Sequence, residues 1–576
     1  MAETLVSPGV ITSENDQSFL QQQPVEAGAA IIGPTVKGPV EIPTIVTTYS
    51  EYQSVFGSTF ESGSDEYSFL TSTSAYNYFN NGGNSLLVTR VVSGSSNWAY
   101  ASSSIPSAIG GGNAVTLEIL YKGEIFNNSG SNLDFATGSL YSGSSDNIRW
   151  EVVNASTASG EFDLIIRRGD DNHNNKRVLE TWTGLSLDPK STNYIARVIG
   201  DQKYQYNSVE NYIEVTGSYR NASRYVRVKS VDAKTPNYFD NAGDAKSDYT
   251  GDIPAVGSGS IAGTFQGGVG SIIPNGRTMN LNHNINSTDS QGLVGDDYDE
   301  MINLLSNQDD YRFNIITVPG LTDSYHTNQL TTLISTIQSR GDAILVYDTV
   351  GHASSITAVV GTASTRNTSY AATYWPWVQI IDPNTGDQVW VPASTVIPGV
   401  YAFNDNVAEA WFAPAGVSRG GLSTVVRPER KLSQANRDTL YQGKVNPIAS
   451  FPGTGIVVYG QKTLQKEASA LDRINVRRLL IELKSYIGQL AQNLVFEQNT
   501  AATRNSFLSQ VNPYLETVVN RQGLYAFKVV MDESNNTPDV IDRNQLIGAI
   551  FVQPTKTAEF IRLDFNILPT GATFPV

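Results

Sequence analysis

The residue types that carry most enzyme chemistry are scarce in this 576-residue chain. It contains no cysteine, which excludes a disulfide framework, a zinc–thiolate site, an iron–sulfur cluster and a cysteine nucleophile. It also lacks the phosphate-binding pattern G-x-x-x-x-G-K-[ST]. Its four histidines have no metal-ligand spacing such as H-x-x-x-H, and each is interpreted as an ordinary core or surface residue. They are His173, His283, His326 and His352. We therefore expect no metal site and no cofactor.

Asp348 is the best candidate for an acid–base group, because it follows a predicted parallel strand, where α/β enzymes often place catalytic residues. Asp323, Ser324 and His326 are close in sequence, but a catalytic triad is defined by geometry in space. Three such residues before a helix are better explained as caps and solvated side chains. The chain is therefore predicted not to be an enzyme.

Three further patterns have structural explanations. The acidic run from Asp296 to Glu300 precedes an apolar segment, where negative charge stabilises the start of a helix. Residues 382–387 resemble a calcium loop, but glycine stands at the fifth position where an oxygen ligand is needed, so a hairpin turn is predicted. An aromatic cluster could be a carbohydrate platform, but its Pro-Gly-rich surroundings favour packing at a junction between domains. The cluster consists of Trp375, Trp377, Trp390, Trp411 and Phe412.

Residues 314–350 predict a strand, a helix and a second strand that pair as a βαβ unit in a parallel sheet. The strands are the apolar runs 315–318 and 343–347. The helix between them starts near Asp323 or Ser324 and ends before Gly341. Its buried stripe has the three-and-four spacing of one helical face. The stripe consists of Leu330, Leu333, Ile334 and Ile337.

A second and longer helix is predicted from Ser469 to about Gln498, with Ser469 and Asp472 as a capping box. At about 1.5 Å per residue, a helix of about thirty residues would span roughly 45 Å and could organise the C-terminal region. Arg477 and Arg478 flank its apolar stripe. They could lie on a solvated or intramolecularly paired face, or they could contact another subunit. The stripe consists of Leu471, Ile474, Leu479, Leu483, Ile487, Leu490 and Leu494.

Both ends of the chain are strand-like. Residues 4–12 form a short strand-competent segment, and Pro8 restricts it to a sheet edge or to a single neighbour. At the other end, apolar residues alternate with polar ones from residue 561 to 567, which places them on one face of a strand. Such strands can fold back onto their own domain or pair with another molecule.

The middle of the chain, residues 99–290, is rich in serine, glycine and asparagine and has many short β-type runs. It predicts a β-rich insertion, such as a sandwich.

The net charge of the chain is −16, but the charge is unevenly distributed. The residues from Lys431 onward carry 15 Lys/Arg against 12 Asp/Glu, a balance of +3, which leaves −19 for residues 1–430. The basic region could face an acidic partner. With no basic–aromatic cluster and no long apolar segment, nucleic-acid binding and membrane insertion are not expected.

A series of short sequence motifs, called words here, occurs in a fixed order along the chain. The N-terminal words are Ser7-Pro8-Gly9-Val10, Gly38-Pro39, Phe56-Gly57, Tyr78-Phe79-Asn80-Asn81-Gly82-Gly83 and Thr89-Arg90-Val91. The later words are Tyr374-Trp375-Pro376-Trp377-Val378, Val391-Pro392, Pro398-Gly399-Val400-Tyr401-Ala402, Trp411-Phe412-Ala413-Pro414-Ala415-Gly416, Asn475-Val476-Arg477-Arg478-Leu479, Phe496-Glu497-Gln498-Asn499 and Ala558-Glu559-Phe560-Ile561. Together, and in this order, these words resemble the sheath subunit of contractile bacteriophage (myovirus) tails. The resemblance covers residues 1–98 and 291–576.

This resemblance implies a mixed α/β, multidomain fold. An α/β sheath core is expected from the N- and C-terminal parts, with a β-rich inserted domain and extended terminal strand arms. The expected divisions are 1–20 for the N-terminal arm, 21–98 for the first part of the core, 99–290 for the insertion, 291–430 for a middle domain, and 431–576 for a C-terminal domain with the long helix and terminal arm.

The resemblance also implies a function. Subunits of this family stack as hexameric rings around a tail tube and contract to drive the tube through the host cell envelope. Expected partners are other copies, the inner tube, and baseplate and terminator proteins, in a virion tail assembled in the host cytoplasm. The arms are expected to join sheets of neighbouring subunits, while Arg477 and Arg478 could contact the tube or another subunit. The expected interface residues are Val6, Val10, Ile11, Ile561, Leu563, Phe565 and Ile567.

Three other functions stay open on the sequence alone. A related sheath could belong to a bacteriocin or another injection machine. A host-binding adhesin would bind polysaccharide through the insertion and form monomers or trimers instead of tubes. An envelope-degrading enzyme would need a converging acid–base pair, for which Asp348 is the candidate.

Overall fold

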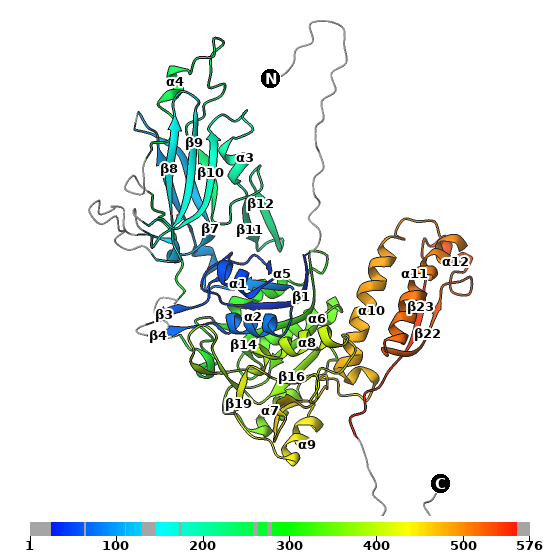
Figure 1. The fold of residues 1–576 in the computed structure, drawn as a ribbon. Helices are drawn as coiled ribbons and strands as arrows, with labels where there is room; N and C mark the ends of the chain where they lie inside the picture. The colour runs from blue at the N-terminus through cyan, green and yellow to red at the C-terminus, as the bar shows by residue number, and fades with distance from the viewer. Residues whose placement is uncertain are drawn as a thin grey trace, which may run out of the picture.

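The computed structural model describes residues 25–62, 65–109, 111–128, 144–171, 175–256, 263–272 and 279–560. Figure 1 shows three bodies: a central α/β body, a β-rich body at one end, and a C-terminal unit of helices and a small sheet beside the centre. Among the described helices, none is both long enough and apolar enough to cross a bilayer.

An eight-stranded sheet forms the central body, in the order β2-β5-β1-β14-β15-β16-β20-β21. Its inner strands run parallel, whereas β2 and β21 pair antiparallel at the two edges. The sheet therefore joins N-terminal strands to strands that follow the insertion. The strands are β1 Val25–Gly33, β2 Thr44–Val46, β5 Leu86–Arg90, β14 Tyr311–Thr322, β15 Ile344–Asp348, β16 Ala371–Trp375, β20 Asn446–Phe451 and β21 Gly455–Val458.

Both faces of this sheet are buried, because alternate residues of each strand enter two different apolar clusters. Ala30 and Ile32 pack with residues of α5, α6, α7 and α9. Ala29 and Ile31 pack with residues of α1, α2 and α8 on the other face. The helices are α1 Tyr49–Phe56, α2 Leu70–Asn80, α5 Asp299–Leu304, α6 Thr327–Arg340, α7 Ile356–Ala363, α8 Ile397–Val407 and α9 Gln434–Gln442.

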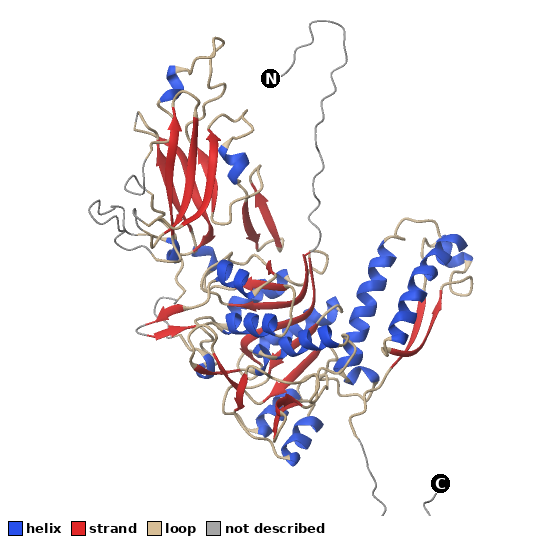
Figure 2. Cartoon of the chain, in the orientation of Figure 1, coloured by secondary structure: helices blue, strands red, loops and turns tan. Residues whose placement is uncertain are grey.

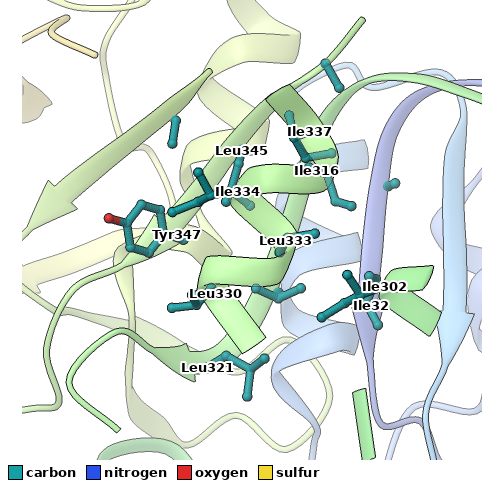
Figure 3. Close-up of a cluster of buried hydrophobic side chains, with 14 of the residues drawn as sticks. Ile32, Ile302, Ile316, Leu321, Leu330, Leu333, Ile334, Ile337, Leu345 and Tyr347 are labelled. Atoms are coloured by element: carbon teal, nitrogen blue, oxygen red, sulfur yellow. The ribbon is translucent and has the colours of Figure 1, made fainter. Parts of the chain in front are cut away.

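The predicted βαβ unit is confirmed as β14, α6 and β15, with the two strands parallel. Leu330, Leu333 and Ile337 are buried against the sheet, and Figure 3 shows them facing Ile316 and Leu345. The helix ends at Gly341, whose φ of 71° is left-handed, a conformation that glycine adopts without steric cost. The predicted helix start in the acidic run is also confirmed, since α5 begins at Asp299.

The β-rich interpretation of the middle region is confirmed. Two three-stranded sheets, β10-β9-β8 and β13-β7-β6, share one apolar core drawn from residues 101–265, and β11-β12 forms a separate hairpin. The elements are β6 Tyr100–Pro106, β7 Asn113–Lys122, β8 Ile148–Ser156, β9 Glu161–Arg168, β10 Val178–Ser186, β11 Lys203–Asn207, β12 Tyr212–Thr216, β13 Val226–Val231, α3 Ile195–Ile199 and α4 Ser247–Thr250.

The chain enters and leaves this β-rich body at one place. Ala99 and Val269 exchange two backbone hydrogen bonds, of 3.0 and 3.2 Å. The returning segment then packs on the central body, since Leu281 contacts the cluster of Val36 and Ile285 joins one face of the large sheet. The described part of the β-rich body therefore begins and ends at the Ala99–Val269 pair.

Residues 382–387 form a hairpin turn, as predicted, and connect β17 to β18. The Asp382 carboxylate accepts hydrogen bonds from the Asn384 backbone N–H and the Ser68 hydroxyl, at 2.9 and 3.2 Å. These strands belong to a three-stranded sheet, and β3 and β4 make a separate small hairpin. The bounds are β3 Phe60–Ser62, β4 Asp65–Tyr67, β17 Val378–Ile381, β18 Gln388–Val391 and β19 Val425–Pro428.

The C-terminal unit contains the predicted long helix, but its limits differ. The α-helix runs over Ile474–Gln492, and the hydroxyl of Ser469 caps only the short 3-10 turn Ala470–Asp472. The capping prediction was wrong because Arg473 is extended, with φ −117° and ψ 136°, and separates the turn from the helix. The elements are α10 Ile474–Gln492, α11 Ala501–Asn520, β22 Leu524–Val530, α12 Pro538–Asp542 and β23 Ala549–Pro554.

Candidate functional site

The C-terminal unit carries a two-stranded antiparallel sheet, made of β22 and β23. Its register pairs Lys528 with Phe551 and Val530 with Ala549. Within the part of the chain that the structure describes, no third strand joins it. Each strand therefore presents one edge whose backbone groups are available to another strand. Figure 2 shows this sheet beside α11, apart from the large central sheet.

The two faces of this small sheet differ. Phe527 and Val552 point inward and pack on the apolar cluster formed with α10 and α11. On the other face, Lys528 and its cross-strand partner Phe551 are exposed, and Phe551 is 61% exposed. Because a two-stranded sheet is marginally stable alone, the packing on α10 and α11 is what maintains it.

The two helices behind the sheet are held together along their length and at their connection. Tyr486 of α10 stacks on Tyr514 of α11, with ring centroids 3.8 Å apart. In the connecting loop, Asn499 accepts a 2.7 Å hydrogen bond from Arg504 and donates one of 2.8 Å to the Gln545 carbonyl. These contacts fix the loop between the helices.

A half-buried contact network ties the end of the described chain to the central body. Glu559 accepts two hydrogen bonds from Arg473, at 2.7 and 2.9 Å. Tyr441 and Gln461 donate to the same carboxylate, at 2.7 and 3.0 Å. Burial acts to raise the pKa of Glu559, but the hydrogen bonds and the charge of Arg473 outweigh it and lower this pKa. We call Glu559 with these three partners the Glu559 clamp. Glu559 lies two residues before residue 561.

Arg477 and Arg478 are both buried in the described structure. Arg478 makes a two-pronged ion pair with Asp405 of α8, at 2.5 and 2.8 Å. Burial acts to lower the pKa of Arg478, but Asp405 outweighs it and the pKa is raised. Arg477 lies 4.0 Å from the Tyr370 ring centroid and donates to Ser369, and burial lowers its pKa. Both side chains thus join α10 to the central body, and a contact with the tube or another subunit stays a prediction.

The predicted aromatic residues do not form a single cluster: Trp411 packs at a junction between bodies as expected, whereas Trp375 lies in the core of the central body. Trp375, Trp377 and Trp411 are at most 8% exposed, while Trp390 is half-buried. Trp411 belongs to the apolar cluster of the C-terminal unit and donates a 3.0 Å hydrogen bond to the Arg521 carbonyl. It therefore connects the segment after α8 to the end of α11.

The predicted interface residues of the arms lie outside the described residues. They are Val6, Val10, Ile11, Ile561, Leu563, Phe565 and Ile567.

Asp348 has the position predicted for it at the end of β15, but its surroundings are those of a structural residue. Its carboxylate accepts hydrogen bonds from the Ser394 hydroxyl and backbone N–H, at 2.5 and 3.1 Å. It is 3% exposed, and burial raises its pKa to about 7. The group holds the turn before α8 against the sheet.

The residues considered for a triad do not converge. Asp323 makes a two-pronged ion pair with Arg366, at 2.5 and 2.9 Å. His326 accepts a 3.3 Å hydrogen bond at Nδ1 from the Thr322 backbone N–H, and burial lowers its pKa. Among the described residues, no group of three or more His, Asp or Glu side chains could hold a metal ion. His173 is outside those residues, and the rings of His283 and His352 lie 5.6 Å apart.

Two features of the site were missed in the sequence. The β22–β23 sheet has a readable signal, because Phe527 and Val529 on one strand and Ile550 and Val552 on the other alternate with outward residues. The Glu559 clamp has none, because its partners are 86, 98 and 118 residues away in the chain.

Comparison with known proteins agrees with this architecture. Residues 293–464 match the phage tail sheath protein central domain, and residues 466–567 match the phage tail sheath C-terminal domain. The second half of the chain thus carries two domains of the phage tail sheath family. The resemblance inferred from the sequence words is thereby confirmed.

Two curated relatives are tail sheath proteins, from Vibrio phage KVP40 and Enterobacteria phage T4. They are 45% and 42% identical over 185 residues, which is 32% of this chain and 28% of each relative. The chain thus matches less than a third of the length of these relatives. The crystal structure of a sheath tail protein from Listeria innocua has the same fold, with a TM-score of 0.52 at 10% identity over 92% of this chain and 95% of that chain.

Proposed function

We propose that the protein is the subunit of a contractile phage tail sheath. It polymerises as stacked hexameric rings around an inner tail tube and contracts to drive the tube through the host cell envelope. The observation that carries the proposal is the β22–β23 sheet, whose two edges are unpaired among the described residues. The family membership of residues 293–567 supports it.

The terminal arms of neighbouring copies are the strands that complete this sheet. The β22 and β23 strands contain 7 and 6 residues, and the strand-competent segments 4–12 and 561–567 are of similar length. Addition of a strand to a sheet edge supplies backbone hydrogen bonds, and alternate side chains set the register. About five hydrogen bonds at about 1 kcal/mol each would stabilise one linkage by roughly 5 kcal/mol.

Contraction then proceeds as a rigid-body rearrangement of subunits that stay linked by their arms. Surface ion pairs contribute only about 0–1 kcal/mol each, so contacts between the bodies exchange at little cost while the arms persist. A small preference per subunit, repeated over many copies, supplies the mechanical work. The Glu559 clamp supports this division, because it fixes the chain to the central body next to the C-terminal arm.

The remaining assignments follow from the sheath role. The central body and C-terminal unit form the inner sheath near the tube, and the β-rich body projects outward. The baseplate and terminator proteins lie at the two ends of the polymer, in a virion tail that is assembled in the host cytoplasm. We propose a structural and not an enzymatic role, which the burial of Asp348 and the pairing of Asp323 with Arg366 support.

The test is assembly of the purified chain, seen by negative-stain microscopy. The parent should form tubes. Deletion of residues 1–12, or the substitution Leu563→Pro, should leave a soluble folded subunit that does not polymerise, because each change removes one donor strand. Normal tubes from either variant would refute the arm mechanism, and monodisperse parent at high concentration would refute the sheath role.

A matched control is a proline elsewhere on an exposed loop. Asn241→Pro lies at the second position of an exposed turn of the β-rich body, where proline is favoured. It should assemble like the parent. Circular dichroism of all variants should match the parent, which separates loss of assembly from loss of folding.

A further inference from the structure

The connection between α10 and α11 presents a phenylalanine to solvent. Phe496 is 101% exposed, and its neighbour Val495 is 61% exposed. Phe496 also has a φ of 72°, a left-handed conformation that a bulky side chain rarely adopts. Such a conformation costs free energy and persists only where the surroundings impose it.

The backbone turn that contains Phe496 is closed by a 3.1 Å hydrogen bond from the Glu497 N–H to the Leu494 carbonyl. The loop is held by the hydrogen bonds of Asn499 to Arg504 and Gln545, and Thr500 caps α11 by accepting a hydrogen bond from the Thr503 backbone N–H at 3.3 Å. The knob, defined as Phe496 with Glu497, is therefore a fixed protrusion that combines an aromatic ring with a negative charge.

The opposite end of the same unit carries a hollow of about 570 Å³. This volume lies within the range of roughly 300–1,000 Å³ that is typical of sites for small organic groups. Its lining combines aromatic and aliphatic side chains with two cations at the rim. The main lining residues are Trp411, Phe412, Leu524, Tyr525, Arg419 and Lys556.

The hollow is preformed and complementary to the knob in charge. Trp411 is fixed by its hydrogen bond to the Arg521 carbonyl, and Arg419 lies over the Phe412 ring at 5.0 Å. Among the described residues, neither Glu497 nor Lys556 has an ion-pair partner in its own chain. An acidic aromatic protrusion thus matches an aromatic hollow with a basic rim.

One molecule cannot fill its own hollow. The knob follows the end of α10, whereas the lining residue Asn475 lies in its first turn. The helix has 19 residues, which at about 1.5 Å per residue separates the two by roughly 28 Å. Figure 1 shows the α10–α11 connection at the end of the unit away from the central body. A contact that joins different surfaces of identical copies generates an open polymer or a ring.

We propose that the knob of Phe496 and Glu497 inserts into the Trp411–Tyr525 hollow of a second copy of this chain. This contact deepens the proposed sheath function and rests on it. It is separate from the arm exchange, because it uses side chains of the folded unit and no terminal strand. It sets the spacing between successive copies, while the arms supply their linkage.

A cross-linking experiment tests the contact, since the parent chain has no cysteine. The double variant Gln498→Cys/Thr557→Cys leaves the knob and the basic rim intact and places one thiol beside each. In assembled sheath, a short bifunctional thiol reagent should convert it into a ladder of covalent multimers. The control Gln498→Cys/Ser364→Cys, with its second thiol on the central body, should give no ladder. A tube without multimers from the first variant would overturn the proposal.

A second experiment changes the size of the Phe496 side chain and the charges of Glu497 and Lys556, and it measures the concentration needed for assembly. Phe496→Ser should raise the concentration needed for assembly by about tenfold, because central aromatic residues dominate interface energies. Phe239→Ser, the same change at a 45% exposed phenylalanine of the β-rich body, should have no effect. Glu497→Lys and Lys556→Glu should each weaken assembly, and the double reversal should restore it. Unchanged assembly by Phe496→Ser would overturn the inference, whereas a parent that forms no polymer would overturn the sheath function itself.

Discussion

Arg473 and Glu559 form a two-pronged ion pair that joins the residue before α10 to the end of the described chain, with N–O distances of 2.7 and 2.9 Å. Tyr441 and Gln461 complete the hydrogen bonding of the carboxylate from the central body. Under the proposed arm exchange, a neighbour that binds residues 561–567 pulls on this contact. The pair is thus placed to pass tension from the arm directly into the central body, past the small sheet.

Glu559→Gln should destabilise this junction by about 1–3 kcal/mol, because it replaces charge-assisted hydrogen bonds by neutral ones. The pKa of Glu559 is lowered in the folded chain, so its stabilising contribution is complete above the ordinary glutamate pKa of about 4.3 and is lost as pH falls through the lowered value. Hydrogen exchange of residues 555–560 at neutral pH measures the change. Protection equal to that of the parent would contradict the role of the clamp.

Arg478 and Asp405 should behave as one energetic unit. The Arg478 side chain is 3% exposed and that of Asp405 is 30% exposed, so removing one partner should cost less than the roughly 3–5 kcal/mol typical of a fully buried pair. Arg478→Gln and Asp405→Asn should each lower the urea midpoint of the full chain, and the double variant should lose less than the sum of the two. A coupling energy of about 1–3 kcal/mol is expected. If Arg478→Gln instead had the stability of the parent and lost only assembly, Arg478 would lie at an intermolecular contact.

Asp348→Asn should stabilise the chain at neutral pH and should not affect assembly. Burial raises the pKa of Asp348 to about 7, so the folded state holds a proton that the unfolded state releases near pH 4. Stability of the parent relative to the asparagine variant should therefore fall as pH rises from about 4 to about 7, by roughly 2–4 kcal/mol. Urea unfolding of both proteins at pH 5 and pH 8 measures it. An equal difference at both pH values would contradict the raised pKa.

The parts of the fold that depend on local pattern could be predicted from the sequence. The stripe of Leu330, Leu333 and Ile337 specifies α6 because helical period and burial act within fourteen residues. The hairpin at 382–387 and the β-rich middle follow for the same reason. The start of α10 could not be placed, because the extended conformation of Arg473 serves its distant partner Glu559 and not the local capping pattern.

The site depends on contacts between distant residues, which the sequence alone does not reveal. Arg478 and Asp405 are 73 residues apart, and Arg473 and Glu559 are 86 apart. Asp348 illustrates the same limit. Its place at the end of a parallel strand is correct, but the turn that contains Ser394 covers it, and no local pattern indicates that cover.

Excision of the β-rich body should leave a subunit that folds and assembles. Ala99 and Val269 are paired by two backbone hydrogen bonds, so a short Asn-Gly turn can join residue 99 to residue 269 without displacing either. The apolar core of this body is drawn from residues 101–265 and is removed as a whole, while Leu281 and Ile285 stay packed on the central body. Some stability should be lost, because Tyr206 and Ile213 pack against the central core and Lys37 pairs with Asp146.

The full-length chain with Lys37→Gln serves as a control for the contact between Lys37 and Asp146 and should assemble normally. Narrower tubes in negative stain, with unchanged axial spacing, are the expected result. An excised variant that aggregates would contradict the division at residues 99 and 269, and one that folds without polymerising would show that the β-rich body contributes to the lattice.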